Sequence, residues 1–463
     1  MITFLENKLF LSFILIMSAF LAIFTIVKFD SLSVLLMVAV FFIFLLALIK
    51  PNFIIYLLIF FIIVGELVRI PLPGSNGTMF VLIVDLVLPI LVLAWFVSIL
   101  KNKKINFPKF ISLHLVLFLI ILFSTFLLNV IFHTPKESLD ALLYLVRFVI
   151  YLFLPLFVFQ LLNIYKDIQR IVYFLLFSGL IVAIGGVIQL ILVPNFSFMT
   201  QFGWDPHSGR ALSTFFDPNF FGGFLVINIS IILGFYFFTR RFSYKFSLAC
   251  LALFEILVLL LTYSRSSYLA FAAMAIIIIL FESRKIFISL IIISVIVLIF
   301  FPRAVSRLEG IRNLDSTAQA RITSWNKALT IIKDHPLTGV GYNFLPSVKL
   351  SYGFIGDPAA HTAGGFDSSL LTLWATTGIF GLFSFIIFYG ALIYQQVRTL
   401  YNKNFSNFNR GLSLGLLACL VALLVHSQFV NSLLYPFIVI FLFIFIGVQL
   451  KLYDLEIKKS TSL

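Results

Sequence analysis

The stretch from Phe246 to Phe281 reads FSLACLALFEILVLLLTYSRSSYLAFAAMAIIIILF and holds two apolar runs separated by a short polar turn. Each run approaches the roughly 20 apolar residues with which a helix crosses a bilayer. A helix also satisfies its own backbone hydrogen bonds, which lipid cannot do. The stretch therefore predicts two membrane-spanning helices, near 246–263 and 266–281, joined by almost no loop.

The same pattern recurs along the whole chain. Of the 463 residues, 62% are hydrophobic and 11% are charged, whereas a soluble domain is about half apolar and a quarter charged. This composition excludes a soluble enzyme, a disordered chain and a coiled coil. It predicts an all-α polytopic membrane protein with about fourteen transmembrane helices. The other expected spans lie near 9–27, 31–49, 53–68, 79–100, 110–132, 141–162, 171–193, 220–239, 286–301, 368–396, 411–427 and 431–450.

The positive residues predict the orientation. In a soluble protein the net charge of +14 would suggest nucleic acid, but in a membrane protein Lys and Arg gather in cytoplasmic loops. With the N-terminus inside, most of the 32 Lys and Arg fall on that side. Both termini are therefore expected in the cytoplasm, and nucleic acid is not an expected partner. The run near 9–27 is followed at once by another, so we interpret it as a first span and not as a signal peptide.

Two outside segments are longer than the other loops, near 194–219 and 302–366. Loops of that length in a compact protein usually carry function or fold on their own. The second one divides the chain into helices 1–11 (1–301), a long extracytoplasmic loop (302–366), and helices 12–14 with a cytoplasmic tail (367–463).

An amphipathic helix is expected within the long loop. Ile322, Trp325, Leu329 and Ile332 follow the spacing of one helical face, and Ser316 can cap the N-terminus. Such a helix would lie on the outer membrane surface or cover a cavity.

Three of the arginines on the expected outer side are candidate site residues, because positive residues there have no topological reason. Arg265 opens the span near 266–281 directly after Ser264, which can cap it, and a guanidinium at a helix N-terminus suits a phosphate. The alternative is a tight turn with a snorkelling arginine. Arg210 precedes the span near 220–239. Arg321 lies on the amphipathic helix, either as part of a site or stacked on Trp325.

Polar residues at the outer ends of other predicted spans are candidates for a general base or for a helix cap. His361 and Asp367 flank the sequence Thr-Ala-Gly-Gly-Phe, and either can act as a general base at an outer membrane mouth. Asp367 can equally cap the following helix, as Asp217 or Asn219 can cap the span near 220–239.

Asp85 and Arg147 are expected at similar depths below the outer boundary. They can pair with each other or serve a substrate. The sequence shows no soluble-enzyme signature: it has no phosphate-binding loop, no HExxH and no clustered Cys/His ligand set.

Taken in order, the motifs resemble the O-antigen ligase/polymerase family of bacterial membrane glycosyltransferases, over about residues 210–381. The matching motifs are Arg210 followed by Ser-Thr-Phe and Asp-Pro-Asn; Thr262-Tyr-Ser-Arg265; Arg321 with Trp325; His335-Pro336 leading to Gly339-Val-Gly341; and Asp367-Ser-Ser-Leu-Leu before Gly378-Ile-Phe-Gly381.

The resemblance implies a GT-C-like fold in the bacterial cytoplasmic membrane and a glycan linked to undecaprenyl diphosphate as substrate. The acceptor would be a glycan or a lipid, with neither metal nor nucleotide sugar involved. Arg210 and Arg265 would bind the diphosphate. The ligases have a histidine where this chain has Asp367, so a polymerase is favoured over a ligase to lipid A-core. A flippase for lipid-linked glycans is the alternative from another class, but no internal repeat supports it.

Overall fold

A computed structural model describes residues 46, 49–71, 80–103, 105, 107–202, 204–282, 315–356 and 363–461. The predicted spans near 9–27 and 286–301, nearly all of the span near 31–49, and the candidate base His361 lie outside the described residues.

The described residues are almost entirely helical. The α-helices are α3 (Phe53–Val64), α4 (Ile83–Asn102), α5 (Lys109–Val130), α6 (Pro135–Leu161), α7 (Tyr165–Leu192), α8 (Pro218–Phe238), α9 (Phe242–Leu261), α10 (Arg265–Glu282), α13 (Ser316–Asp334), α14 (Leu345–Ser351), α15 (Ser369–Tyr401), α16 (Asn407–His426) and α17 (Pro436–Thr461). The 3-10 helices are η1 (Gly65–Leu67), η2 (Ser197–Phe202), η3 (Ser213–Phe215) and η4 (Ser432–Leu434). One antiparallel pair of strands joins β1 (Arg69–Pro71) to β2 (Phe80–Leu82), with Arg69 opposite Leu82.

Within the described residues, 9 helices are long and apolar enough to cross a membrane, namely α4 to α9 and α15 to α17. Helices α3 and α10 are shorter apolar helices. Each of these helices falls on a predicted span, which confirms an all-α polytopic membrane protein. Helix α17 continues to Thr461, past the predicted end near 450, because its last turns are polar and hydropathy detects only the apolar part.

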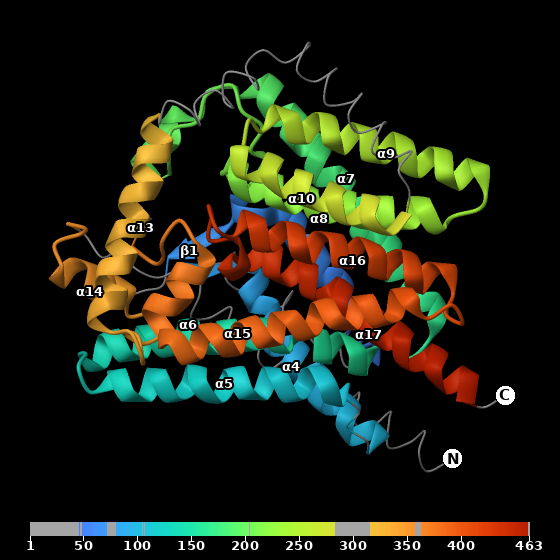
Figure 1. Cartoon of the computed structure of the whole chain (residues 1–463), viewed down its shortest axis with the longest axis horizontal. Helices are drawn as coiled ribbons and strands as arrows, with labels where there is room; N and C mark the ends of the chain where they lie inside the picture. The colour runs from blue at the N-terminus through green and yellow to red at the C-terminus, as the bar shows by residue number, and fades with distance from the viewer. Residues whose placement is uncertain are drawn as a thin grey trace, which may run out of the picture.

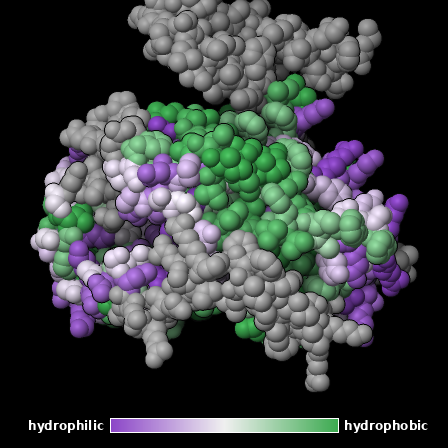
Figure 2. All heavy atoms as spheres, turned by 90° about the horizontal axis from the view of Figure 1, so that it is seen from above, coloured by the Kyte–Doolittle hydropathy of each residue, from purple (hydrophilic) through white to green (hydrophobic). Residues whose placement is uncertain are grey.

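The long helices run roughly along one direction, and α13 crosses them at one end (Figure 1). The C-terminus lies at the opposite end (Figure 1). Figure 2 shows a broad hydrophobic surface across the middle of one face, with hydrophilic residues gathered toward both ends. An apolar belt between polar ends is the surface that a helical membrane protein presents to lipid and to the two aqueous sides.

The segment after α13 is fixed against α15 at a kink. Helix α15 is interrupted at Gly378, whose φ of 67° favours glycine. A Cβ atom at this position would overlap the carbonyl of Leu337. Three backbone hydrogen bonds join the two segments: Ile379 N–H to Pro336 O, Val340 N–H to Ala375 O and Gly341 N–H to Thr376 O. Helix α13 is therefore anchored to a membrane-spanning helix.

Helix α13 confirms the predicted amphipathic helix but corrects two details. Its N-cap is Asp315, whose carboxylate accepts the N–H of Ala318, and not the predicted Ser316. Its buried residues are Ala328, Ile331 and Ile332. Two residues of the predicted face, Ile322 and Leu329, are exposed. The side of α13 that is buried is instead the one that packs against α15 and against Phe366, in the loop before α15.

Candidate functional site

A cavity of about 350 Å³ opens between the loop before α8, the turn joining α9 to α10, and α13. Its lining residues are Asp205, Pro206, His207, Arg210, Asn219, Tyr263, Arg265, Ser316, Thr317, Ala320 and Arg321. The three arginines singled out from the sequence thus share one cavity, although they come from segments far apart in the chain. Asp205 is the one carboxylate among these lining residues, so the cavity is cationic and suits an anion.

Arg210 is held by the turn between α9 and α10. Its Nε donates to the carbonyl of Thr262 at 2.8 Å, and Nη2 donates to the carbonyl of Tyr263 at 3.3 Å. Tyr263 has a φ of 48°, a left-handed conformation that turns the chain sharply between the two helices. The turn therefore orients the Arg210 guanidinium before any ligand binds.

Arg265 is the first residue of α10 and is only 8% exposed. Its Nη2 lies 2.8 Å from Asp315 Oδ1, the carboxylate that also caps α13. A guanidinium has five N–H donors, and this contact uses one nitrogen. The ion pair holds α13 against the start of α10.

Two helix N-termini meet at the cavity. Ser264 caps α10 as predicted, because its Oγ accepts the N–H of Ser267 at 3.3 Å. Asp217 caps α8 by accepting the N–H groups of Asn219 at 2.7 Å and Phe220 at 2.9 Å. The hydroxyl of Ser264 donates to Asn219 Oδ1 at 2.8 Å, which joins the two termini. Each terminus adds a partial positive charge to that of the arginines.

Arg321 reaches the cavity from α13. Burial lowers the pKa of Arg321; the charge of Asp367 raises it in part, and the charge of Arg265 lowers it further. An arginine starts so far above neutral that it stays charged. Among the described residues no ring contact joins Arg321 to Trp325, whose ring lies 6.0 Å from that of Phe429.

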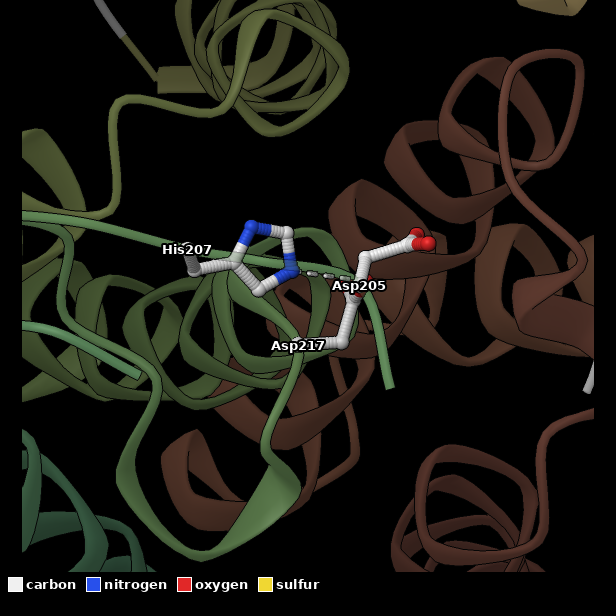
Figure 3. Close-up of side chains that lie close together, drawn as sticks. All are labelled: Asp205, His207 and Asp217. Atoms are coloured by element: carbon white, nitrogen blue, oxygen red, sulfur yellow. Dashed lines mark ion pairs between the residues drawn. The ribbon is translucent and has the colours of Figure 1, made fainter. Parts of the chain in front are cut away.

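Asp205, His207 and Asp217 form a cluster at the edge of the cavity (Figure 3). Nε2 of His207 lies 3.8 Å from Oδ2 of Asp217, and one ligand atom of each residue lies within 4.8 Å of the others (Figure 3). These donors could hold a metal ion. Burial alone would raise the pKa of Asp217, but His207, the N–H of Phe220 and the charge of Arg210 outweigh it and lower the pKa to about 2.

Asp367 lies beside α13 and does not line the cavity. Its N–H donates to Ser324 Oγ at 3.0 Å, and its carbonyl accepts from Trp325 Nε1 at 3.1 Å. The N-cap of α15 is Ser368, so the alternative that Asp367 caps this helix is wrong. Burial raises the pKa of the Asp367 carboxyl, and the charge of Arg321 offsets only part of this shift.

Asp85 and Arg147 form a pair away from the cavity lining. Arg147 Nε lies 2.9 Å from Asp85 Oδ1, and the hydroxyl of Tyr151 contacts both groups, at 2.8 and 2.7 Å. Asp85 also accepts the N–H of Leu82 at the start of α4. The pairing alternative is therefore confirmed.

Several residues at the site were not singled out from the sequence: Asp205, His207, Ser267, Asp315 and His426. Asp315 directly precedes the first helical residue of α13, where a capping aspartate is common, so a signal was available. Ser267 and His426 carry no such signal, because isolated polar residues at the ends of apolar runs are ordinary in packed helices.

Residues 247–386 match the family model described as O-antigen ligase. The matched region contains Arg265, Arg321 and Asp367, and Arg210 precedes it. A comparison with curated proteins gives no match. The match covers about a third of the chain and supports the resemblance to which the sequence motifs pointed.

Proposed function

Since residues 247–386 carry an O-antigen ligase family domain, we propose that this integral membrane protein transfers or polymerises glycan repeat units from undecaprenyl diphosphate. The observation that carries the proposal is the convergence of Arg210, Arg265 and Arg321 on one cavity. A lipid-linked diphosphate is an anion that fits such a set of guanidinium groups.

The arginines act on the leaving group. As the bond between the anomeric carbon and the diphosphate oxygen breaks, negative charge grows on that oxygen. Arg210 and Arg265, with Arg321, stabilise this charge, and positioned donors of this kind are often the largest contribution to catalysis. Transfer would then proceed without a metal ion or a nucleotide.

A carboxylate or imidazole prepares the acceptor. Asp367, or His361 in its place, takes the proton of the acceptor hydroxyl as its oxygen forms the new bond to the anomeric carbon. A single displacement of this kind inverts the configuration at that carbon. The raised pKa of Asp367 brings this base closer to neutral pH than an ordinary aspartate.

We further propose a polymerase in preference to a ligase to lipid A-core, because Asp367 stands at the position of the ligase histidine. The proposal includes a GT-C-like scaffold of fourteen spans, divided at 1–301, 302–366 and 367–463. It places the protein in the bacterial cytoplasmic membrane with both termini inside and the cavity at the outer face.

The test supplies purified protein with an undecaprenyl-diphosphate oligosaccharide in the presence of EDTA and without nucleotide. Longer glycans, resolved by gel electrophoresis and mass spectrometry, are the expected result. A product seen only when lipid A-core is added would make the protein a ligase. No product with any acceptor would contradict the proposed function, and activity lost with EDTA but restored by a divalent ion would contradict metal independence.

A further inference from the structure

A chain of hydrogen bonds runs from the cavity into the helix bundle. Asn219 Oδ1 accepts from the hydroxyl of Ser264 at 2.8 Å, and Ser264 Oγ lies 2.9 Å from Ser267 Oγ. Ser267 Oγ lies 3.3 Å from Nε2 of His426, the last residue of α16. Ser264, Ser267 and His426 are all buried, so bulk water does not reach them.

The chain has one favourable direction because each hydroxyl has a single proton. If Ser264 donates to the side-chain oxygen of Asn219, Ser267 donates to Ser264 at 2.9 Å, a shorter contact than its 3.4 Å to the backbone carbonyl of Asn219. His426 then donates its Nε2 proton to Ser267. In the reverse direction Nε2 would accept and Nδ1 would carry the proton. Nδ1 of His426 is buried and has no hydrogen-bond partner among the described residues. An orphan buried N–H costs about 1–3 kcal/mol, so the first direction is favoured.

This direction determines which end of the Asn219 amide faces the ligand. Its carbonyl oxygen is turned toward Ser264, so its NH2 group is turned toward the cavity that Asn219 lines. No hydrogen bond occupies this NH2 group within the described part of the chain. An amide NH2 is purely a donor, which makes it complementary to an anionic oxygen.

We propose that Asn219 binds a phosphate oxygen of the lipid-linked diphosphate, and that His426 is a positioning residue that keeps its amide in this orientation. The proposal rests on the proposed function for the identity of the anion. It adds a neutral donor to the three arginines and couples the cavity to α16.

Two glycines of α8 allow this chain of hydrogen bonds to form. A Cβ atom at Gly222 would overlap Ser267 Oγ, and one at Gly223 would come within 3.0 Å of His426 Cε1. The close approach of α8 to α10 and α16 thus brings Asn219, Ser267 and His426 within reach of one another.

Nuclear magnetic resonance shows the direction of this chain of hydrogen bonds directly, because it identifies which ring nitrogen of His426 carries the proton. The protein has 6 histidines, so ¹³C,¹⁵N-histidine labelling gives few ring signals, and the His426 signal is the one missing from His426→Gln. We expect the tautomer with the proton on Nε2. A neutral ring with its proton on Nδ1 would overturn the proposed orientation.

Binding of glycan-free undecaprenyl diphosphate to the purified protein tests the role of Asn219. Asn219→Ala should weaken binding about 10-fold, the size expected for one lost hydrogen bond to a charged group. Ser267→Ala should also weaken binding, whereas Ser247→Ala, the same change at an exposed position of α9, should not. Unchanged binding in both Asn219→Ala and Ser267→Ala would overturn the proposal.

The conservative variants of His426 separate positioning from general packing. Glutamine can place an N–H group near the position of Nε2, whereas asparagine is too short. We expect His426→Gln to keep the affinity and His426→Asn to lose it, and equal loss in both would overturn the positioning role. Neither measurement needs glycosyl transfer. A protein that gives the expected binding results but forms no product would therefore contradict the proposed function and leave the roles of Asn219 and His426 standing.

Discussion

Arg265 Nη2 lies 2.8 Å from Asp315 Oδ1, and this contact joins the first residue of α10 to the residue that caps α13. One carboxylate therefore orients a cavity arginine and also starts the helix that covers the cavity. This contact, together with the anchoring of α13 to α15, fixes the position of Arg265 relative to Arg321.

Asp315→Ala should lower the free energy of unfolding by about 1 kcal/mol, the usual cost of losing an N-cap. Asp315→Asn should lose much less, because asparagine also caps helices well. Denaturant unfolding of the purified protein measures both. An equal loss in the two variants would assign the stability to the ion pair with Arg265 and not to the cap.

Asp367→Asn should lower the turnover number about 10²- to 10⁴-fold if Asp367 is the base. In the wild type, activity should fall as the pH drops through the pKa of Asp367. Because that pKa is raised, the acid limb should lie at a higher pH than for an ordinary aspartate. A raised pKa also means that folding favours the protonated form, so the variant should not be destabilised at neutral pH. An active Asp367→Asn enzyme would leave His361 as the base.

Arg147→Met should destabilise the protein by about 1.5–3 kcal/mol, because it removes the charged partner of the partly buried Asp85 carboxylate. The double variant Asp85→Asn/Arg147→Met should recover part of this loss. The activity per folded molecule should stay near the wild-type value in the double variant. A stable Arg147→Met protein that cannot bind donor would instead assign Arg147 to the substrate.

Gly378→Ala should destabilise the junction between α13 and α15, because a left-handed φ and the nearby Leu337 carbonyl both oppose a Cβ atom. Gly390→Ala in the same helix is the matched control, since nothing lies within 4 Å of a Cβ atom there. Alanine should be neutral or stabilising at that site. Thermal unfolding compares the two, and equal melting temperatures would contradict the argument.

The sequence allowed the membrane-spanning helices to be predicted because burial in lipid demands long apolar runs. It also marked Arg210, Arg265 and Arg321, since arginines on the outer side lack a topological reason. The sequence alone did not identify the buried face of α13, because packing against α15 determines which face is buried. The sequence offered Asp367 as a cap of α15, whereas the structure has Ser368, because both are good capping residues and only the backbone geometry distinguishes them.

Donor kinetics of Arg210→Ala and Arg265→Ala test the central claim most directly, with Arg240→Ala at the other end of α8 as the matched control. Each hydrogen bond from a charged donor is worth about 1.5–3 kcal/mol, so each cavity variant should lower kcat/KM for the undecaprenyl-diphosphate donor about 10- to 100-fold. Arg240→Ala should behave like the wild type. Full activity in both cavity variants would contradict the account.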